Sequence, residues 1–345
     1  MSRCHPERSE GPRPRGTWRA WRSAWCALLL SLATLTPATA QSGTAFVSNE
    51  ASHDVSVVDL ATRKTISTIK LPGRARGIQL SRDGRTLYVA SSDDNPRPAS
   101  KANAIVVIDV ATRKITATYR AGSDPETFAL TPDGKLLYAS NEDGGTATVL
   151  DARSGKHVKT LVVGIEPEGI AITPDGRWVA VTAETSNSVS VIDQKTNKVV
   201  DNLLVDLRPR AAAFSPDGSR LYVTAEISGT LSVIDAKSHA LLKTIVLDRG
   251  EAKPVGVAVS PDGQRVYVAN GWSGTLSIVD AAANQLIATV PVGKRPWGVA
   301  VSADGKFVYT ANGMSNDVAI VDAASRRVVG RIAVGQRPWG IALTR

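Results

Sequence analysis

The stretch Ser260-Pro-Asp-Gly-Gln-Arg-Val-Tyr-Val-Ala-Asn270 decides the fold, because close copies of it recur along the chain. The glycines of these copies lie at positions 84, 134, 176, 218, 263 and 305. Successive copies are therefore 50, 42, 42, 45 and 42 residues apart. A self-similar period of about 20 to 50 residues is typical of repeat architectures, so the usual rule of about 150 residues per domain does not apply to this chain.

Each repeat contains four short, β-branched segments separated by Gly, Asp, Asn or Pro. In the copy quoted above, the segment 266–270 is followed by Leu276-Ser-Ile-Val-Asp280, which ends in an aliphatic-Asp pair. A third segment runs to the Val-Gly turn at 292–293, and a fourth is Gly-Val-Ala-Val at 298–301. Four strands in about 42 residues predict one blade of a β-propeller. A helical period of 3.6 residues is absent, which excludes a helical solenoid.

The seventh repeat is split between the two ends of the chain. Residues 45–71 supply three of its strands, and the C-terminal residues 339–345 supply an innermost strand with no turn after it. We therefore predict an all-β fold, a seven-bladed β-propeller whose ring is closed when the C-terminal strand completes the N-terminal blade. Closure protects strand edges that would otherwise be open to pairing with another chain.

Residues 1–40 have the features of a secretory signal peptide. Six arginines come before a short apolar core at 27–35, and the small-residue site Ala38-Thr-Ala40 follows it. The apolar core is far shorter than the roughly 20 residues of a membrane span. We predict cleavage after Ala40, a single propeller domain over 41–345, and a periplasmic or secreted protein with no membrane anchor after cleavage.

Composition and charge exclude several classes of protein. The chain is 43% hydrophobic and 21% charged, which excludes an intrinsically disordered protein. Both cysteines, Cys4 and Cys26, lie in the leader, so the mature chain has no disulfide, thiolate metal site or cysteine nucleophile. The leader carries six Arg and two Glu, a net +4, which leaves +5 of the total +9 for residues 41–345. No Lys/Arg block of the nucleic-acid-binding kind occurs, so nucleic acid is not expected as a partner.

One face of the predicted ring varies from blade to blade. The loops of a blade alternate between two faces. The Pro-Asp-Gly turns repeat monotonously on one face, whereas the loops that lead into the innermost strands lie on the other. Residues in six of these inner loops form a candidate binding surface at the channel mouth: Arg74, Arg76, Asp124, Glu126, Glu166, Glu168, Arg208, Arg210, Arg295, Trp297, Arg337 and Trp339.

These residues suggest a mouth with an acidic arc opposite an arc of Arg and Trp. Arg and Trp are enriched at binding hot spots, and opposite potentials favour specific docking. A purely structural interpretation remains equally open, in which Arg76 pairs with Glu126, Arg210 pairs with Glu168, and the tryptophans plug the channel. The two interpretations are compatible.

Catalytic and metal-binding motifs are scarce. The three histidines after the leader, His53, His157 and His239, lie in turns of different blades, where solvated histidines are common. No zinc motif, nucleophile elbow or phosphate-binding loop occurs. We therefore expect no cofactor and no metal. Calcium bound by the acidic arc is a weaker alternative, because no EF-hand spacing supports it.

The Tyr-Val-Ala-Asn, Ser-Val-Ile-Asp and Pro-x-Gly-Ile-Ala segments resemble the YVTN family of β-propellers over residues 44–345. Segments such as Ser123-Asp-Pro-Glu-Thr-Phe and Ala311-Asn-Gly-Met-Ser-Asn-Asp-Val are similar to the propeller proteins associated with PQQ-dependent catabolism. That resemblance implies an accessory role beside a periplasmic PQQ-dependent alcohol dehydrogenase. PQQ itself would then belong to the partner, because the eight blades and paired cysteines of a quinoprotein dehydrogenase are not present.

Two functions remain open. The first is a non-catalytic binding or scaffold propeller that docks a periplasmic protein, for example a PQQ-dependent alcohol dehydrogenase or its cytochrome c. The second is a periplasmic hydrolase, lactonase-like or metal-assisted, that uses Glu126, Glu166 or Glu168 with Arg210. The absence of His and Cys near the mouth favours binding over catalysis, but propellers host both classes.

Overall fold

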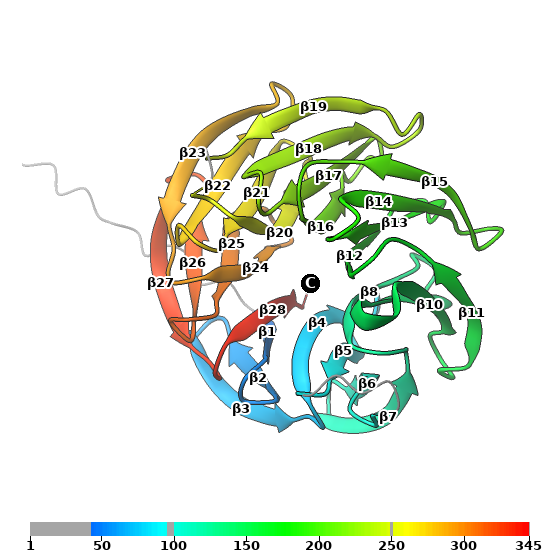
Figure 1. The fold of residues 1–345 in the computed structure, drawn as a ribbon. Coiled ribbons are helices and arrows are strands. Elements are labelled where there is room, and N and C mark those ends of the chain that lie inside the picture. The colour runs from blue at the N-terminus through cyan, green and yellow to red at the C-terminus, as the bar shows by residue number, and fades with distance from the viewer. Residues whose placement is uncertain (1–42, 95–99, 249–250, 345) are drawn as a thin grey trace, which may run out of the picture. The chain divides into compact units, whose positions relative to one another are not determined.

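The computed structural model describes residues 43–94, 100–248 and 251–344. These residues form seven four-stranded antiparallel sheets arranged around a central axis (Figure 1). The predicted seven-bladed propeller is therefore confirmed. The predicted signal peptide lies outside the described residues. Within them, no helix is long and apolar enough to cross a membrane.

The blades are numbered here in chain order, and the strands of each are given from the innermost outward. Blade 1 contains β28 (Pro338–Leu343), β1 (Thr44–Asn49), β2 (Asp54–Asp59) and β3 (Lys64–Lys70). Blade 2 contains β4 (Arg74–Leu80), β5 (Thr86–Ser92), β6 (Ala104–Asp109) and β7 (Lys114–Arg120). Blade 3 contains β8 (Pro125–Leu130), β9 (Leu136–Asn141), β10 (Thr146–Asp151) and β11 (His157–Val162), with the 3-10 turn η1 (Glu142–Gly144) after β9.

The remaining four blades repeat the same order. Blade 4 contains β12 (Pro167–Ile172), β13 (Trp178–Ala183), β14 (Ser188–Asp193) and β15 (Lys198–Leu204). Blade 5 contains β16 (Pro209–Phe214), β17 (Arg220–Ala225), β18 (Thr230–Asp235) and β19 (Leu241–Val246). Blade 6 contains β20 (Pro254–Val259), β21 (Arg265–Asn270), β22 (Thr275–Asp280) and β23 (Gln285–Pro291). Blade 7 contains β24 (Pro296–Val301), β25 (Phe307–Asn312), β26 (Asp317–Asp322) and β27 (Arg327–Ala333).

The ring closes in blade 1, as predicted. β28 pairs with β1 in antiparallel register, so that Phe46 lies opposite Ala342 and Val47 opposite Ile341. A further pair of hydrogen bonds joins Thr44 and Thr344 just beyond the ladder. The two ends of the described propeller are therefore held together by strand pairing.

The repeated Pro-Asp-Gly turns are stabilised by their own side chains. In blade 6 the Ser260 hydroxyl donates to Asp262 at 2.5 Å and accepts from the Arg265 amide at 2.9 Å. Gly263 adopts a φ of 72°, a conformation that glycine tolerates at no steric cost. These bonds satisfy the turn locally, so the turn residues need no ligand to explain them.

The hydrophobic core lies between neighbouring blades. For example, Tyr222 and Leu231 of blade 5 pack in one cluster with Val266 and Val268 of blade 6. Near the axis the blades approach so closely that a Cβ on Gly256 would lie 2.2 Å from the Trp297 carbonyl oxygen. Tight packing on both sides of every blade holds the loops at the two ends of the ring in fixed positions.

Candidate functional site

Six of the seven inner loops share one backbone design, in which a left-handed residue precedes the first residue of the inner strand, a proline, and a bulge follows that proline. In most loops the residue before the inner-strand proline has a left-handed φ, for example 61° at Arg208 and 53° at Arg295. The pairing register then shifts just after that proline, as between Pro209 and Ala212. A bulge of this kind redirects the side chain at its position. The residue after the proline, such as Arg210, therefore faces the channel instead of the neighbouring strand.

A cavity of about 560 Å³ occupies the mouth. Its size lies within the range of small-molecule sites, roughly 300 to 1,000 Å³. Eight of the twelve predicted residues line it: Arg76, Glu168, Arg208, Arg210, Arg295, Trp297, Arg337 and Trp339. Glu50, Glu142, Glu226, Gly313, Met314 and Pro338 complete the wall.

The other four predicted residues lie outside the cavity wall. Asp124 and Glu126 are buried beneath it, and Arg74 binds Asp124 at 2.9 Å. Glu166 accepts a hydrogen bond from the Thr185 hydroxyl on the rim of the neighbouring loop. The structure therefore brings most of the predicted surface together but places part of the acidic arc inside the protein.

Glu50 and Glu226 line the mouth although the sequence analysis did not select them. Each directly follows the second strand of its blade, the same position that Glu142 and Glu184 occupy in blades 3 and 4. Aligning the residue after each second strand would have found them. The next two equivalents, after β21 and β25, are Gly271 and Gly313.

Arg210 is the centre of a buried network of ion pairs. Its Nη2 atom lies 3.0 Å from Glu168, its Nη1 atom contacts Glu184, and Glu226 lies 3.6 Å away. Arg208 also binds Glu184, at 2.6 Å, and lies 3.3 Å from Glu226. The Arg210–Glu168 pair of the structural interpretation is thus present, and it crosses from blade 5 to blade 4.

A second network surrounds Arg76 on blade 2. Its guanidinium contacts the fully buried Glu126 of blade 3 and lies 3.4 Å from Glu50 and 3.7 Å from Glu142. The expected Arg76–Glu126 pair is therefore present as well. The Arg76 network joins blades 1, 2 and 3, and the Arg210 network joins blades 4 and 5; the two lie side by side as a charged layer below the mouth.

Carboxylates outnumber guanidinium groups in this layer. Seven acids, Glu50, Asp124, Glu126, Glu142, Glu168, Glu184 and Glu226, surround four arginines, Arg74, Arg76, Arg208 and Arg210. Burial raises the pKa of Glu168 to about 8, although Arg210 opposes the shift; the carboxylate of Glu184 adds to it. Burial raises the pKa of Glu142 too, with Arg76 opposing. At neutral pH the Glu168 carboxyl is therefore mostly protonated.

Arg295 and Arg337 form the opposite side of the mouth and are exposed. Neither makes an ion pair within the described residues. Arg295 lies over the Trp297 ring at 4.9 Å, and Arg210 lies at 5.0 Å from the same ring. The buried Trp297 indole N–H has no acceptor among the described residues. An unsatisfied buried donor in a cavity that is also lined by Arg295 and Arg337 favours a ligand that carries acceptor atoms and negative charge.

Carboxylate oxygens also gather closely enough for a metal ion to be considered. Asp124, Glu126 and Glu142 form one such group, and Glu142, Glu168 and Glu184 form another. Arg76 already contacts two acids of the first group, and Arg210 two of the second. Because guanidinium groups neutralise these carboxylates, the donor set fits an ion-pair network better than a calcium site.

The channel continues below the mouth. A cavity of about 200 Å³ shares Glu168, Arg210, Trp297 and Trp339 with the mouth, and the centroids of the two indoles are 6.3 Å apart. The two tryptophans therefore stand at the boundary between the two cavities.

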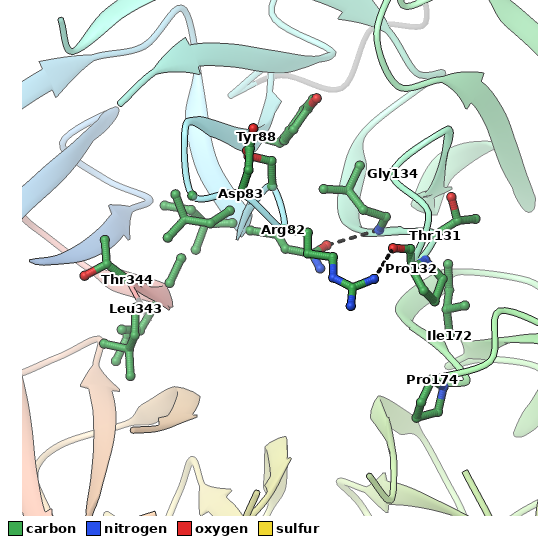
Figure 2. A pocket seen from close by; sticks show the side chains of 18 of the residues that line it. Arg82, Asp83, Tyr88, Thr131, Pro132, Gly134, Ile172, Pro174, Leu343 and Thr344 are labelled. Atoms are coloured by element: carbon green, nitrogen blue, oxygen red, sulfur yellow. Dashed lines mark hydrogen bonds between the residues drawn. The ribbon is translucent and has the colours of Figure 1, made fainter. Parts of the chain in front are cut away.

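A further cavity of about 790 Å³ opens at the opposite face, where the Pro-Asp-Gly turns lie (Figure 2). Arg82 replaces the usual turn proline there and donates to the Pro132 carbonyl at 3.3 Å (Figure 2). Ile172 and Leu343 form apolar parts of its wall. The mouth is the stronger candidate for a ligand site of the two openings, because it holds buried charges and arginines that make no ion pair within the described residues.

Comparison with protein families identifies the relatives of this chain. Residues 38–160 and 207–328 match the family described as "Lactonase, 7-bladed beta-propeller". The chain belongs to this family. The search of curated proteins finds no match for this lactonase-family propeller.

Solved structures share the lactonase-family fold at low sequence identity. Hydrazine synthase of Kuenenia stuttgartiensis is 24% identical, with a TM-score of 0.72 over 82% of this chain and 93% of that one. A functionally unknown protein from Desulfotomaculum acetoxidans DSM 771 is 18% identical, with a TM-score of 0.76 over 88% and 99%. A Bacteroides uniformis protein provisionally assigned as a 6-phosphogluconolactonase is 18% identical, with a TM-score of 0.72 over 88% and 100%. At these identities the likeness concerns the fold.

Proposed function

We propose that this lactonase-family propeller hydrolyses a lactone that carries an acidic group, and that the reaction takes place at the channel mouth. One observation carries the proposal. Glu168, a carboxyl group with a pKa of about 8, borders a ligand-sized cavity whose opposite wall holds the unpaired Arg295 and Arg337. Strongly shifted carboxyl groups in a cavity are typical of general acid–base catalysts.

In this proposal Glu168 moves the proton. Its ionised form accepts a proton from water as the water oxygen attacks the ring carbonyl carbon. The guanidinium groups of Arg210 and Arg295 stabilise the negative charge that develops on the carbonyl oxygen. When the ring C–O bond breaks, Glu168 returns the proton to the leaving alkoxide, and the product is an open-chain hydroxy acid.

The other residues of the cavity wall recognise the substrate. Arg337 binds the acidic group of the substrate as a charge-assisted, forked hydrogen-bond donor. The Trp297 indole N–H donates to a ring oxygen or hydroxyl group, and the faces of Trp297 and Trp339 pack against the ring. Glu50, Glu142 and Glu226 accept hydrogen bonds from substrate hydroxyl groups. A phosphorylated or carboxylated sugar lactone has all of these features.

The test is hydrolysis of 6-phosphogluconolactone compared with unphosphorylated gluconolactone, after subtraction of the uncatalysed rate. We expect kcat to rise with pH and level off above about pH 8, as Glu168 loses its proton. Glu168→Gln is expected to lower kcat about 10²- to 10⁴-fold. Arg337→Met is expected to raise KM for the phosphorylated lactone and to leave KM for gluconolactone unchanged.

Glu251→Gln is the matched control, because Glu251 is exposed and lies outside the mouth cavity. It should retain full activity. If the purified protein hydrolyses neither lactone, or if Glu168→Gln is as active as Glu251→Gln, the proposal is refuted.

A binding role beside periplasmic PQQ-dependent alcohol oxidation stays a second proposal. It is supported by the resemblance of the blade segments and by the exposed Arg295 and Arg337 at the rim. Its test is direct binding of a purified PQQ-dependent alcohol dehydrogenase or its cytochrome c. Arg295→Ala combined with Arg337→Ala should abolish that binding, and equal affinity of the variant and the original protein would contradict it.

A further inference from the structure

Each inner strand contributes one apolar residue to the channel just below the mouth. It is the third residue after the inner-strand proline, or the equivalent position in β4, and the inner strands stand around the central axis (Figure 1). All seven residues line the cavity of about 200 Å³, and they are here called the apolar ring: Ile341, Ile78, Phe128, Ile170, Ala212, Val257 and Val299.

The apolar ring faces the cavity on its inner side and packed protein on its outer side. Six of its members are only partly buried, and Phe128 is 7% exposed. On the outer side, Val257 packs against the core cluster between blades 5 and 6, and Val299 packs against the cluster between blades 6 and 7. The ring is therefore held in place without a ligand, and a hydrocarbon group that covers its inner side removes apolar surface from water.

Charged groups reach this cavity only at its upper end. Among the described residues that line it, Glu168 and Arg210 are the only charged ones, and they pair with each other at 3.0 Å. Thr127 supplies the one hydroxyl group, which donates to the backbone carbonyl of Glu168. The side chains of the apolar ring offer no hydrogen bond to water or to a ligand hydroxyl group, whereas a hydrocarbon chain requires none.

The mouth above the apolar ring carries charges of both signs, but only part of them are paired. Each carboxyl group of the mouth wall and of the charged layer beneath it pairs with an arginine of that layer. Arg295 and Arg337 line the mouth and pair with no acid in the part of the chain that the structure describes. Trp297, whose buried indole N–H lacks an acceptor there, lines both the mouth and the cavity below it. An anionic group is therefore favoured on the side of the mouth that blades 7 and 1 form.

We propose that the channel binds an aliphatic monocarboxylate, with its carboxylate group on Arg295 and Arg337 and its hydrocarbon chain inside the apolar ring. Guanidinium groups bind carboxylates through forked hydrogen bonds. An apolar interior with a few polar groups at fixed positions is typical of small-molecule sites. Trp339 and Ile341 are two residues apart on β28, so the ring begins about 7 Å beyond the tryptophans. Acetate is therefore too short to reach the ring, and a longer alkanoate reaches it.

The same cavity bears on the substrate of the proposed hydrolysis. Glu168 and Arg210 border both the mouth and the cavity below it, so a lactone held by them directs a hydrocarbon substituent into the apolar ring. The preferred substrate is then an acidic lactone with an alkyl substituent. This choice of substrate rests on the proposed function, whereas binding of an alkanoate requires no reaction.

The experiment is calorimetric titration of the purified protein with acetate, butanoate, hexanoate and octanoate at neutral pH. Once the chain reaches the ring, we expect the affinity to rise about fourfold for each added methylene group, the increment that burial of one CH₂ supplies. The heat capacity change of binding should become more negative with chain length, because more apolar surface is buried. Octanoate that does not bind, or an affinity that is the same for all four alkanoates, overturns the proposal.

Two sets of substitutions in the apolar ring locate the chain. Val257→Thr combined with Val299→Thr keeps the shape of the ring but places hydroxyl groups in it, and it should weaken octanoate binding at least tenfold. Ala212→Leu fills the ring without a polar group and should weaken octanoate binding as well, so it serves if the double variant does not fold. The matched control is Val200→Thr combined with Val246→Thr, at exposed positions of β15 and β19, which should bind octanoate as the original protein does.

Arg295→Met combined with Arg337→Met tests the position of the carboxylate group. It should weaken hexanoate and octanoate by the same factor and keep the increment per methylene group. Octanoate binding that is unchanged in folded ring variants, or unchanged in this arginine variant, contradicts the proposed pose. The readout is heat of binding, so the two proposals fail separately. A protein that binds octanoate but hydrolyses no lactone refutes only the hydrolysis, and a lactonase that binds all alkanoates equally refutes only the apolar subsite.

Discussion

Arg210 illustrates how one side chain influences the protonation of a neighbour. It lies between Glu168 and Glu184, both buried, and its positive charge opposes the rise that burial causes in the pKa of Glu168. A buried pair of this kind adds little net stability relative to an apolar core, because both charges leave water. Removing one partner is different, since the other charge is then buried alone.

Arg210→Met should therefore destabilise the propeller by about 3–5 kcal/mol at pH 8. The loss should be smaller at pH 5, because Glu168, whose pKa burial raises to about 8, is then protonated and needs no positive partner. Urea unfolding at both pH values measures the difference. Arg265→Met, which removes a more exposed pair with Asp280, should cost no more than about 1 kcal/mol and serves as the control. An equal loss in both variants, or a loss for Arg210→Met that does not change with pH, would contradict this account.

Strands have unequal roles in the ring, although their sequences are similar. β28 is the element that joins the end of the chain to its beginning, and its partner β1 lies about 300 residues away in sequence. Without β28, blade 1 loses its innermost strand and blades 2 and 7 lose the surface on which they pack.

Deletion of residues 338–345 should therefore open the ring and lower the melting temperature of the whole domain by more than 10 °C, since a loss of 1 kcal/mol shifts Tm by about 2–4 °C in a protein of this size. Calorimetry of the truncated protein checks this. An unchanged melting temperature would mean that the remaining six complete blades are stable without closure.

At the scale of the whole molecule, the sequence predicted the fold more completely than it predicted the burial and contacts of the residues at the channel mouth. Repeat spacing and turn residues are local signals, so the blade count, the closing strand and the face of the inner loops are all confirmed. Burial depends on neighbours from other blades. For that reason the sequence placed Glu126 on the surface arc, whereas in the structure it is fully buried against Arg76.

The raised pKa of Glu168 could not be predicted from the sequence for the same reason, because it results from burial and from the carboxylate of Glu184 in the loop after β13. Glu50 and Glu226 were missed for another reason: the pattern that identifies them is visible only after the second strands are aligned.

The ring should also tolerate a change in where the chain begins. A permutant that starts at Gly263, ends at Asp262 and joins residue 344 to residue 43 by a short glycine linker recreates the natural closure in blade 6, between β20 and β21. We expect its melting temperature to lie within a few degrees of the original. Failure to fold would show that closure in blade 1 has a specific role beyond ring topology.

The left-handed residue before the inner-strand proline and the bulge after it give six of the seven blades the same backbone frame at the mouth. Of the two residues that flank the proline position, the cavity wall receives both from blades 1, 5 and 7, one from blades 2 and 4, and none from blades 3 and 6. A new specificity can therefore be engineered on blades 1 and 7, whose Arg337 and Arg295 make no ion pair within the described residues, at less cost in stability than on blade 5, where Arg210 also holds the charged layer together.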